Sequence, residues 1–318
     1  MNKCGNFPAC GGCTLRNMDA GEYVATKLAM LDGIECGHLR GLTCIGDGAR
    51  RRTRFQIDYG ANVGFYKAHT NEVVPVAECP NLLPEINAVI EPLRKLFKSL
   101  ARRYDGAVEV VATDNGLSLR FNMDIAQIDR KKVEDFIREY ATPEPYVMFG
   151  DTKVPYVAGM FLQPSKESQD AIVETVRGFA NGAKHIADLF SGLGLFTFSL
   201  AEPGRSFTAY DCDKKAIAGM KKLGANTHVA DLFKKPVKDF DSFDLAILDP
   251  PREGAQTQAK ALANSNLKHV IYVSCNPATF KRDAQILGQA DFKIGEIAPI
   301  DQFPYTRHLE LVADLLRA

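Results

Sequence analysis

The sequence has no long apolar run and no targeting segment. None of its hydrophobic stretches approaches the roughly 18 consecutive apolar residues of a membrane-spanning helix. The N-terminus, MNKCGNFPACGGC, lacks the basic and then apolar pattern of a secretory signal peptide. Both absences predict a cytoplasmic protein with no membrane partner and reduced thiols. We therefore interpret its eight cysteines as metal ligands, catalytic groups or packing residues before disulfides.

Net charge is absent as well, since 39 basic residues balance 39 acidic ones. A general nucleic-acid coat protein is usually basic, so any contact with RNA or DNA must depend on local patches. One such patch contains Arg50, Arg51, Arg52 and Arg54. It is equally consistent with phosphate contacts and with a solvated turn before a strand.

Internal repeats and low-complexity tracts are also missing, and 318 residues are enough for two domains. Residues 1–160 contain short alternating stretches such as RFQIDYG and GLSLRFNM, which predict antiparallel strands with one or two helices, an α+β domain. Residues 161–318 alternate apolar runs with helical patterns, which predicts an α/β domain with a doubly wound parallel sheet. We expect no barrel domain before the N-terminal cysteines.

Polar residues follow the predicted strands of the second domain, where α/β sheets bind ligands. The first strand runs into DLFSGLGLF, in which Gly192 and Gly194 allow close approach of a ligand, and the second ends at Asp211, which could bind a ribose diol. The third glycine of a nicotinamide-binding fingerprint is missing. These features fit a dinucleotide fold, an S-adenosylmethionine fold or a structural turn about equally.

Three further groups are expected at the same edge. Two prolines directly after a buried strand hold Asp249 there, and the next strand delivers Cys275 in YVSCNP. Glu310 begins a last strand that could pair near it. A thiol at the open end of a strand is a candidate nucleophile, so we predict that a thiol and two carboxylates converge on a glycine-lined pocket.

Five motifs in this order resemble those of the S-adenosylmethionine-dependent RNA uracil-C5 methyltransferases, over essentially the whole chain: MFLQPS, DLFSGLGLF, LDPPREG, YVSCNPATFKRD and TRHLELV. The resemblance implies a class I, Rossmann-like methyltransferase domain in which Cys275 is the nucleophile and Glu310 the base. It also implies a cofactor pocket lined by Gln163, Phe190, Asp211, Asp231 and Asp249. The sequence departs from the family pattern at Pro164, Ser165 and Leu195.

The chemistry of this family explains the residue types. Carbon 5 of uracil is too electron-poor to accept a methyl group directly, so a thiolate adds to carbon 6 and a carboxylate later removes the carbon-5 proton. The ring must also be unstacked or flipped. Two other functions stay open, a methyltransferase for exocyclic amines and a non-catalytic RNA-binding protein. The first typically has an aromatic residue after Pro-Pro, where this chain has Arg252.

A second group of cysteines lies near the N-terminus. Cys4, Cys10 and Cys13 have the spacing C-x5-C-x2-C, and Cys79 follows far downstream. A zinc ribbon would need two Cys-x-x-Cys pairs, whereas iron–sulfur clusters accept three close cysteines and a distant fourth. The resemblance also favours a 4Fe-4S cluster, because several relatives bind one with this pattern. We interpret the cluster as a structural staple in the RNA-facing domain, with redox control as the alternative. Cys36, Cys44 and Cys212 are interpreted as packing residues.

The sequence does not determine the target RNA. Relatives modify uridine 54 in the T-loop of transfer RNA or uridines in loops of 23S ribosomal RNA. The expected cluster favours ribosomal RNA, and the expected lack of a barrel favours a small loop. We predict a 23S rRNA methyltransferase that acts as a monomer.

Overall fold

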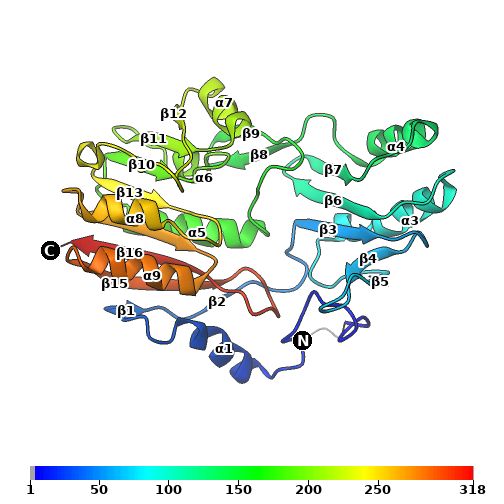
Figure 1. Cartoon of the computed structure of the whole chain (residues 1–318), viewed down its shortest axis with the longest axis horizontal. Coiled ribbons are helices and arrows are strands. Elements are labelled where there is room, and N and C mark those ends of the chain that lie inside the picture. Colours follow the sequence, from blue (N-terminus) through cyan, green and yellow to red (C-terminus); the bar gives the residue numbers. More distant parts are fainter. Residues whose placement is uncertain (1–3, 318) are drawn as a thin grey trace.

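The computed structural model describes residues 4–317. One unit contains an antiparallel sheet, at the right of Figure 1, with the strand order β5 (Val73–Pro75), β4 (Val63–Tyr66), β3 (Arg52–Ile57), β6 (Gly106–Thr113) and β7 (Gly116–Asn122). Its helices are α2 (Pro84–Asn87), α3 (Ile90–Ser99) and α4 (Gln127–Tyr140). The apolar faces of α3 and α4 share one buried core with the sheet, to which Phe55, Leu93 and Phe136 belong. RFQIDYG and GLSLRFNM therefore supply the antiparallel strands that their alternating pattern predicts.

A larger sheet has nine strands among the described residues. Its order is β1 (His38–Leu39), β15 (Phe292–Asp301), β16 (Glu310–Arg317), β14 (His269–Ser274), β13 (Leu245–Leu248), β10 (His185–Leu189), β11 (Ser206–Asp211) and β12 (Asn226–Val229), and β2 (Thr43–Cys44) also pairs with β15. Strands β10 to β14 are parallel to one another, whereas β16 is antiparallel to both β14 and β15. This reversed strand brings the start of β16 to the carboxyl end of β14.

Helices cover both faces of the larger sheet: α5 (Lys166–Phe179), α6 (Leu195–Ser199) and α7 (Lys214–Lys222) on one, and α8 (Gln256–Ala263) and α9 (Pro277–Gly288) on the other. Side chains alternate between the two cores, because successive strand residues point to opposite faces. In β13, Leu245 and Ile247 belong to the core under α5, and Ala246 and Leu248 to the core under α8. The doubly wound arrangement predicted for residues 161–318 is therefore present.

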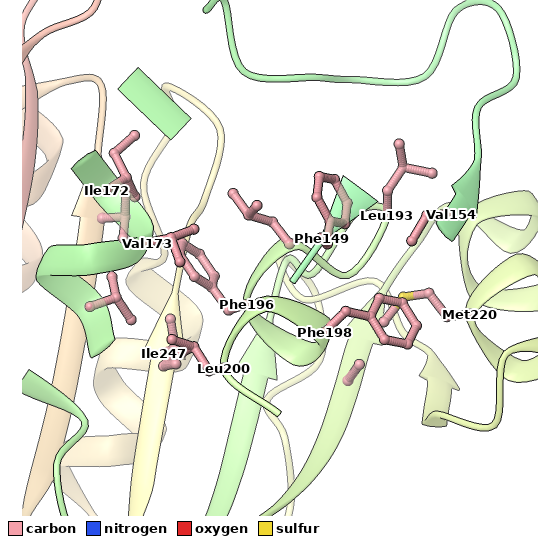
Figure 2. Close-up of a cluster of buried hydrophobic side chains, with 14 of the residues drawn as sticks. Phe149, Val154, Ile172, Val173, Leu193, Phe196, Phe198, Leu200, Met220 and Ile247 are labelled. Carbon is pink, nitrogen blue, oxygen red and sulfur yellow. The ribbon is translucent and has the colours of Figure 1, made fainter. Parts of the chain in front are cut away.

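Helix α5 begins directly after a residue type that favours helix N-caps. The hydroxyl of Ser165 accepts a hydrogen bond from the Ser168 N–H and so caps the first turn. The side chains of Ile172, Val173 and Val176 are buried against the sheet. Figure 2 shows Ile172 and Val173 in this apolar cluster beside Phe196.

Several segments before residue 161 also pack on the larger sheet. Strands β1 and β2 extend it at β15, and α1 (Ala20–Leu28) with the short 3-10 helix η1 (Ala29–Leu31) lies next to them (Figure 1). The hairpin of β8 (Tyr146–Phe149) and β9 (Thr152–Pro155) contributes Phe149 and Val154 to the core that contains Phe198 and Met220 (Figure 2). A second 3-10 helix, η2 (Phe240–Ser242), precedes β13. Segments from both predicted sequence ranges thus build this sheet and its cores.

The arginine run does not form the solvated turn considered for it from the sequence, and a phosphate contact stays a prediction. Arg51 is buried, and its Nε donates to the main-chain oxygen of Gln163 at 3.0 Å. Arg52 forms an ion pair of 3.0 Å with Glu109 in the antiparallel sheet. Only Arg54 of these three side chains is exposed. The run therefore joins the antiparallel unit to the segment before α5.

No helix within residues 4–317 is both long enough and apolar enough to cross a membrane.

Candidate active site

A cavity of about 500 Å³ lies at the carboxyl ends of β10, β11, β13 and β14, next to the start of β16. We call it the strand-end pocket. Its lining contains both predicted catalytic residues and all the predicted cofactor-binding residues except Asp231: Gln163, Phe190, Asp211, Asp249, Cys275 and Glu310. The side chain of Asp231 instead forms an ion pair of 3.1 Å with Lys234, while its neighbours Ala230 and Leu232 line the pocket.

The strand register explains why the thiol and a carboxylate lie together. Strands β14 and β16 are antiparallel, and Ser274 pairs with Leu311. The next residue of the first strand is Cys275 and the preceding residue of the second is Glu310. These two residues, 35 positions apart in the numbering, therefore lie side by side at the pocket.

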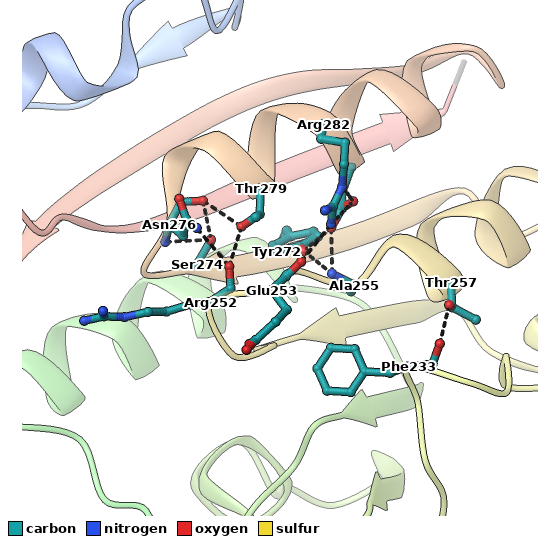
Figure 3. Close-up of polar contacts among 11 residues, drawn as sticks. Phe233, Arg252, Glu253, Ala255, Thr257, Tyr272, Ser274, Asn276, Thr279 and Arg282 are labelled. Atoms are coloured by element: carbon teal, nitrogen blue, oxygen red, sulfur yellow. Dashed lines mark hydrogen bonds and ion pairs between the residues drawn. The ribbon is translucent and has the colours of Figure 1, made fainter.

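The turns that end β13 and β14 are tied to each other. The main-chain oxygen of Arg252 accepts hydrogen bonds from the Asn276 side-chain amide at 2.9 Å and from the Thr279 hydroxyl at 3.1 Å, as Figure 3 shows. Asn276 also caps α9 through its side chain, and Pro277 occupies the first helical position. Cys275 therefore sits on a braced turn between a strand and a helix.

Carboxyl groups surround the thiol. Burial, with Glu310 and Asp249 nearby, raises the pKa of Cys275 to about 11, against a smaller lowering by Arg252. Burial and then Asp249 also raise the pKa of Glu310 well above its usual range. Since like charges in one buried site disfavour ionisation, the pocket by itself retains these protons. A cationic ligand would reverse that effect.

Two aspartates at the strand ends have the same character, Asp249 in the pocket lining and Asp188 in β10. Burial, with a smaller contribution from Asp188, raises the pKa of Asp249 to about 7. Burial also raises the pKa of Asp188 to about 7, with a small further rise from Asp211 and a lowering by the hydrogen bonds from Thr197. Asp188 accepts hydrogen bonds from the N–H and hydroxyl of Thr197 at 3.1 and 2.6 Å, which anchors the glycine loop to β10. The strand-end pocket is thus an acidic site with an ordered wall.

The glycine loop leaves room beside Asp211. Gly192 has φ of +52° and no atom within 4 Å of the position of a Cβ, so open space faces it. Its N–H donates to Asp211 Oδ2 at 2.9 Å. Gly194 has a different reason to be glycine, because a Cβ there would lie 2.7 Å from side-chain atoms of Phe198 and Met220. The first glycine shapes the pocket, and the second allows α6 to pack.

Sequence reasoning missed several pocket residues, among them Phe161, Phe233, Gln302 and Phe303. The rings of Phe190 and Phe233 lie 5.5 Å apart and form an apolar wall. Phe161 lies in the MFLQPS motif, next but one to Gln163, which is a signal that could have found it. Phe233 and Phe303 have no distinguishing pattern, and the available signal for Gln302 is its closeness to Glu310 in the sequence. Leu195, at the family departure, is buried in the core and does not line the pocket.

A second cavity, of about 250 Å³, is lined by the four cysteines predicted to bind the cluster, Cys4, Cys10, Cys13 and Cys79. We call it the cysteine cavity. The sulfur of Cys10 accepts a hydrogen bond from the Gly12 N–H at 3.4 Å. Burial and the neighbouring thiols raise the pKa of Cys79 to about 11. Within residues 4–317, however, no three His, Cys, Asp or Glu side chains are arranged to hold a metal ion, so the cluster stays a prediction.

The other cysteines do not all pack. Cys36 is partly buried against the core under α9, but Cys44 and Cys212 are exposed. Cys212 lines the strand-end pocket, because it directly follows the end of β11. Packing therefore does not account for these two thiols.

Known proteins resemble this chain along most of its length. A family model described as tRNA (Uracil-5-)-methyltransferase matches residues 225–317. An uncharacterized RNA methyltransferase of Mesorhizobium japonicum is 31% identical, over 98% of this chain and 83% of its own. The 23S rRNA (uracil(1939)-C(5))-methyltransferase of Haemophilus influenzae is 29% identical, over 98% and 81%.

A solved structure shares the fold. The tRNA (uracil-54, C5)-methyltransferase of Pyrococcus abyssi, in complex with S-adenosyl-L-homocysteine, superimposes with a TM-score of 0.79 at 23% identity. The match covers 97% of this chain and 86% of the other. Both the antiparallel unit and the larger sheet therefore fall within the shared architecture.

Proposed function

Because this chain belongs to the family of RNA uracil-C5 methyltransferases, we propose that it methylates carbon 5 of a uridine in 23S ribosomal RNA. As a member of the family it is an S-adenosylmethionine-dependent RNA methyltransferase. The ribosomal target and the residue roles are the proposal. The observation that carries those roles is the register of β14 and β16, which sets Cys275 beside Glu310 in the strand-end pocket.

Gln163, Phe190, Asp211 and Asp249 would hold S-adenosylmethionine, which supplies a methyl group on a positively charged sulfonium. Asp211 is suited to a ribose diol, because the N–H groups of Gly192 and Asp213 are each bound to a different one of its oxygens and leave lone pairs on both. The wall formed by Phe190 and Phe233 suits a flat, apolar ring. Asp231 stays in the proposal as a residue at the edge of this wall.

The chemistry of the target ring gives Cys275 and Glu310 separate roles. The Cys275 thiolate adds to carbon 6, and after methylation of carbon 5 the Glu310 carboxylate accepts the carbon-5 proton, so that the thiolate can leave. Both steps need ionised groups, although the pKa values of both are raised in the free pocket. A positive charge bound beside Asp249 would lower the pKa of each group, so ligand binding prepares the site.

We also propose that Cys4, Cys10, Cys13 and Cys79 bind a 4Fe-4S cluster. The four thiols line one cavity, and such a cluster is larger than a single metal ion, which is consistent with thiols that do not converge on one point. The Gly12 N–H is already directed at the sulfur of Cys10, as is common around cluster sulfurs. The cluster would tie residues 4–13 to the turn at Cys79.

The ribosomal target rests on the Haemophilus influenzae relative, which is named for 23S rRNA and is 29% identical over most of both chains. Transfer RNA is the second candidate, because the Pyrococcus abyssi enzyme is named for uracil 54 of tRNA and shares the fold. Mapping 5-methyluridine in both RNAs from cells that lack this protein distinguishes them. Loss in neither RNA would contradict both targets. Cytoplasmic location and a monomeric state stay predictions.

The role of Glu310 has a direct test. Glu310→Gln keeps the size of the side chain but cannot accept a proton, so the variant should accumulate methylated RNA linked to Cys275. A denaturing gel after incubation with S-adenosylmethionine and substrate RNA detects this adduct. RNA with 5-fluorouridine at the target should trap the unmodified enzyme in the same way and serves as the positive control. Normal turnover by Glu310→Gln would rule out the role.

A further inference from the structure

Gln302 occupies an unusual position in the strand-end pocket. It directly follows β15, and only 3% of its surface is exposed. Its Nε2 donates to Glu310 Oε2, and its Oε1 is buried without a hydrogen-bond partner among the described residues. A buried amide oxygen without a partner is costly, which indicates that a ligand donor satisfies it. Gln302 lines the pocket together with Cys275, so that ligand is one bound in the reaction site.

The backbone on both sides of Gln302 is held in place by Lys27. The Lys27 ammonium is fully buried and donates to Asp301 Oδ1 at 2.6 Å and to the main-chain oxygen of Phe303 at 3.1 Å. It also donates to the main-chain oxygen of His308 at 2.6 Å. One cation thus holds the residues before and after Gln302 and the end of the same loop. The backbone that carries the Gln302 side chain is therefore fixed, and the amide itself is held by its hydrogen bond to Glu310.

The orientation of the amide is determined by Glu310. In the structure the N–H side of Gln302 faces Glu310. Once a bound positive charge has lowered the pKa of Glu310 and the carboxylate is ionised, it only accepts hydrogen bonds and so requires that side of the amide to face it. The Oε1 atom must then face away from Glu310. Rotation of the amide by 180° would place two acceptors against each other. The pocket therefore presents a fixed hydrogen-bond acceptor next to the group that removes the carbon-5 proton.

Uracil and cytosine differ in the group that such an acceptor meets. The pairing edge of uracil has one donor, the N3–H, between two carbonyl oxygens, whereas N3 of cytosine is an acceptor. Gln163 Oε1 is also buried and unpartnered among the described residues, but Gln163 already has a proposed role with S-adenosylmethionine, whose amino group is a donor. This leaves Gln302 Oε1 for the base.

We propose that Gln302 recognises the N3–H of the target uracil through Oε1, and that Glu310 fixes the amide in the orientation that excludes cytosine. The inference rests on the proposed function, since it assumes a uracil in the strand-end pocket. It makes Gln302 a specificity-determining residue that couples recognition of the base to the position of the proton acceptor.

The proposal is tested by changing both partners of the proposed hydrogen bond, the N3 group of the target base and the side chain at position 302. Two copies of a 23S rRNA fragment are synthesised with uridine or 3-methyluridine at the target, and kcat/KM is measured for both. The unmodified enzyme should prefer uridine by at least about 100-fold, since the methyl group removes the donor and leaves Oε1 unpaired. Gln302→Ala removes the acceptor and makes room for the methyl group. Its activity on uridine should fall, while its preference shrinks to about threefold or less.

Gln163→Ala is the matched control, because it removes a second buried glutamine from the same pocket. It should weaken S-adenosylmethionine binding and keep the full preference for uridine. A residue that only supports Glu310 would lower activity on both RNAs equally, so an unchanged preference in Gln302→Ala overturns the inference. If the alanine variant does not fold, Gln302→Met, of similar size but without an amide group, takes its place. The ratio of kcat/KM for uridine RNA to that for 3-methyluridine RNA is then measured with this variant. Failure of the unmodified enzyme to methylate the uridine fragment would instead overturn the ribosomal target.

Discussion

Cysteine occupies two contrasting environments in this protein. In the cysteine cavity, the sulfur of Cys10 accepts a hydrogen bond from the Gly12 N–H, and that of Cys13 accepts one from the Asn81 side-chain amide. Guanidinium groups of Arg16 and Arg50 line the same cavity. Hydrogen-bond donors and cations stabilise thiolates, which is what metal ligands require.

In the strand-end pocket the surroundings of the thiol have the opposite charge. Burial, then Glu310 and Asp249, raise the pKa of Cys275, and Arg252 and a backbone hydrogen bond act against them. A nucleophile in such a site stays protonated until a ligand changes the local charge. Burial raises the pKa of both Cys79 and Cys275, so the neighbours of a thiol, more than its burial, distinguish the proposed cluster ligands from the proposed nucleophile.

The largest effect should come from removing the thiol of the strand-end pocket. Cys275→Ala should lower methyl transfer by at least about 1,000-fold, while affinity for S-adenosylmethionine changes by no more than about threefold, because the pocket wall persists. Transfer from radiolabelled donor and calorimetric titration measure the two quantities. Cys36→Ala, outside both cavities, is the control and should have normal activity. More than trace methylation by Cys275→Ala would exclude the thiol from the mechanism.

Removing a thiol from the cysteine cavity should act on metal content and stability. Protein purified without oxygen should be brown and contain iron, and Cys79→Ser should lose iron and unfold at a temperature lower by at least about 5 °C. Iron analysis and thermal unfolding measure both changes. Cys44→Ser, at an exposed thiol, should match the unmodified protein. Colourless, iron-free protein with full activity would disprove the cluster.

The acidity of the strand-end pocket predicts a pH-dependent stability. The pKa of Asp249 is about 7 in the folded protein and near 3.8 when unfolded, so its stabilising contribution is present below pH 3.8 and is lost as the pH rises through 7. Asp249→Asn cannot titrate. Its free energy of unfolding relative to the unmodified protein should therefore rise between pH 5 and 8, by about 2 kcal/mol. Denaturant titrations without S-adenosylmethionine at both pH values measure this, and a constant difference would contradict it.

The smallest effect is expected in the reactivity of Cys275, and it tests whether the Glu310 carboxylate raises the pKa of that thiol. Glu310→Gln removes a neighbouring carboxylate, so the pKa of Cys275 should fall and its alkylation by iodoacetamide at pH 9 should become about three- to tenfold faster. Peptide mass spectrometry follows the reaction. The exposed Cys212 in the same protein is the internal reference. Equal alkylation rates at Cys275 with and without Glu310 would show that this carboxylate does not hold the thiol proton.

Local patterns carried much of the architecture and part of the site. Ser165 and the apolar stripe of α5 are close in the sequence and in space, so the start and the buried face of this helix can be predicted from the local sequence. The ends of β13 and β14 could also be predicted from the sequence, because Pro250 and Pro251 stop β13 and Pro277 follows β14. Since parallel strands share one edge of a sheet, the convergence of Asp249 and Cys275 followed from the same patterns.

Tertiary structure decided the remaining features, because they depend on contacts between distant residues. Strands β1 and β2 have two residues each, too few for any periodicity, and exist only as partners of β15. Arg51 looked like a surface charge until its bond to Gln163 placed it between the two units. Lys27 and Asp301 are 274 positions apart, and no local pattern records their ion pair. Local sequence patterns alone fix where strands such as β13 and β14 end and which reactive groups, such as Asp249 and Cys275, follow them. The antiparallel return of β16 and the buried lysine decided how those groups face one another, since packing energy depends on proximity in space and not along the chain.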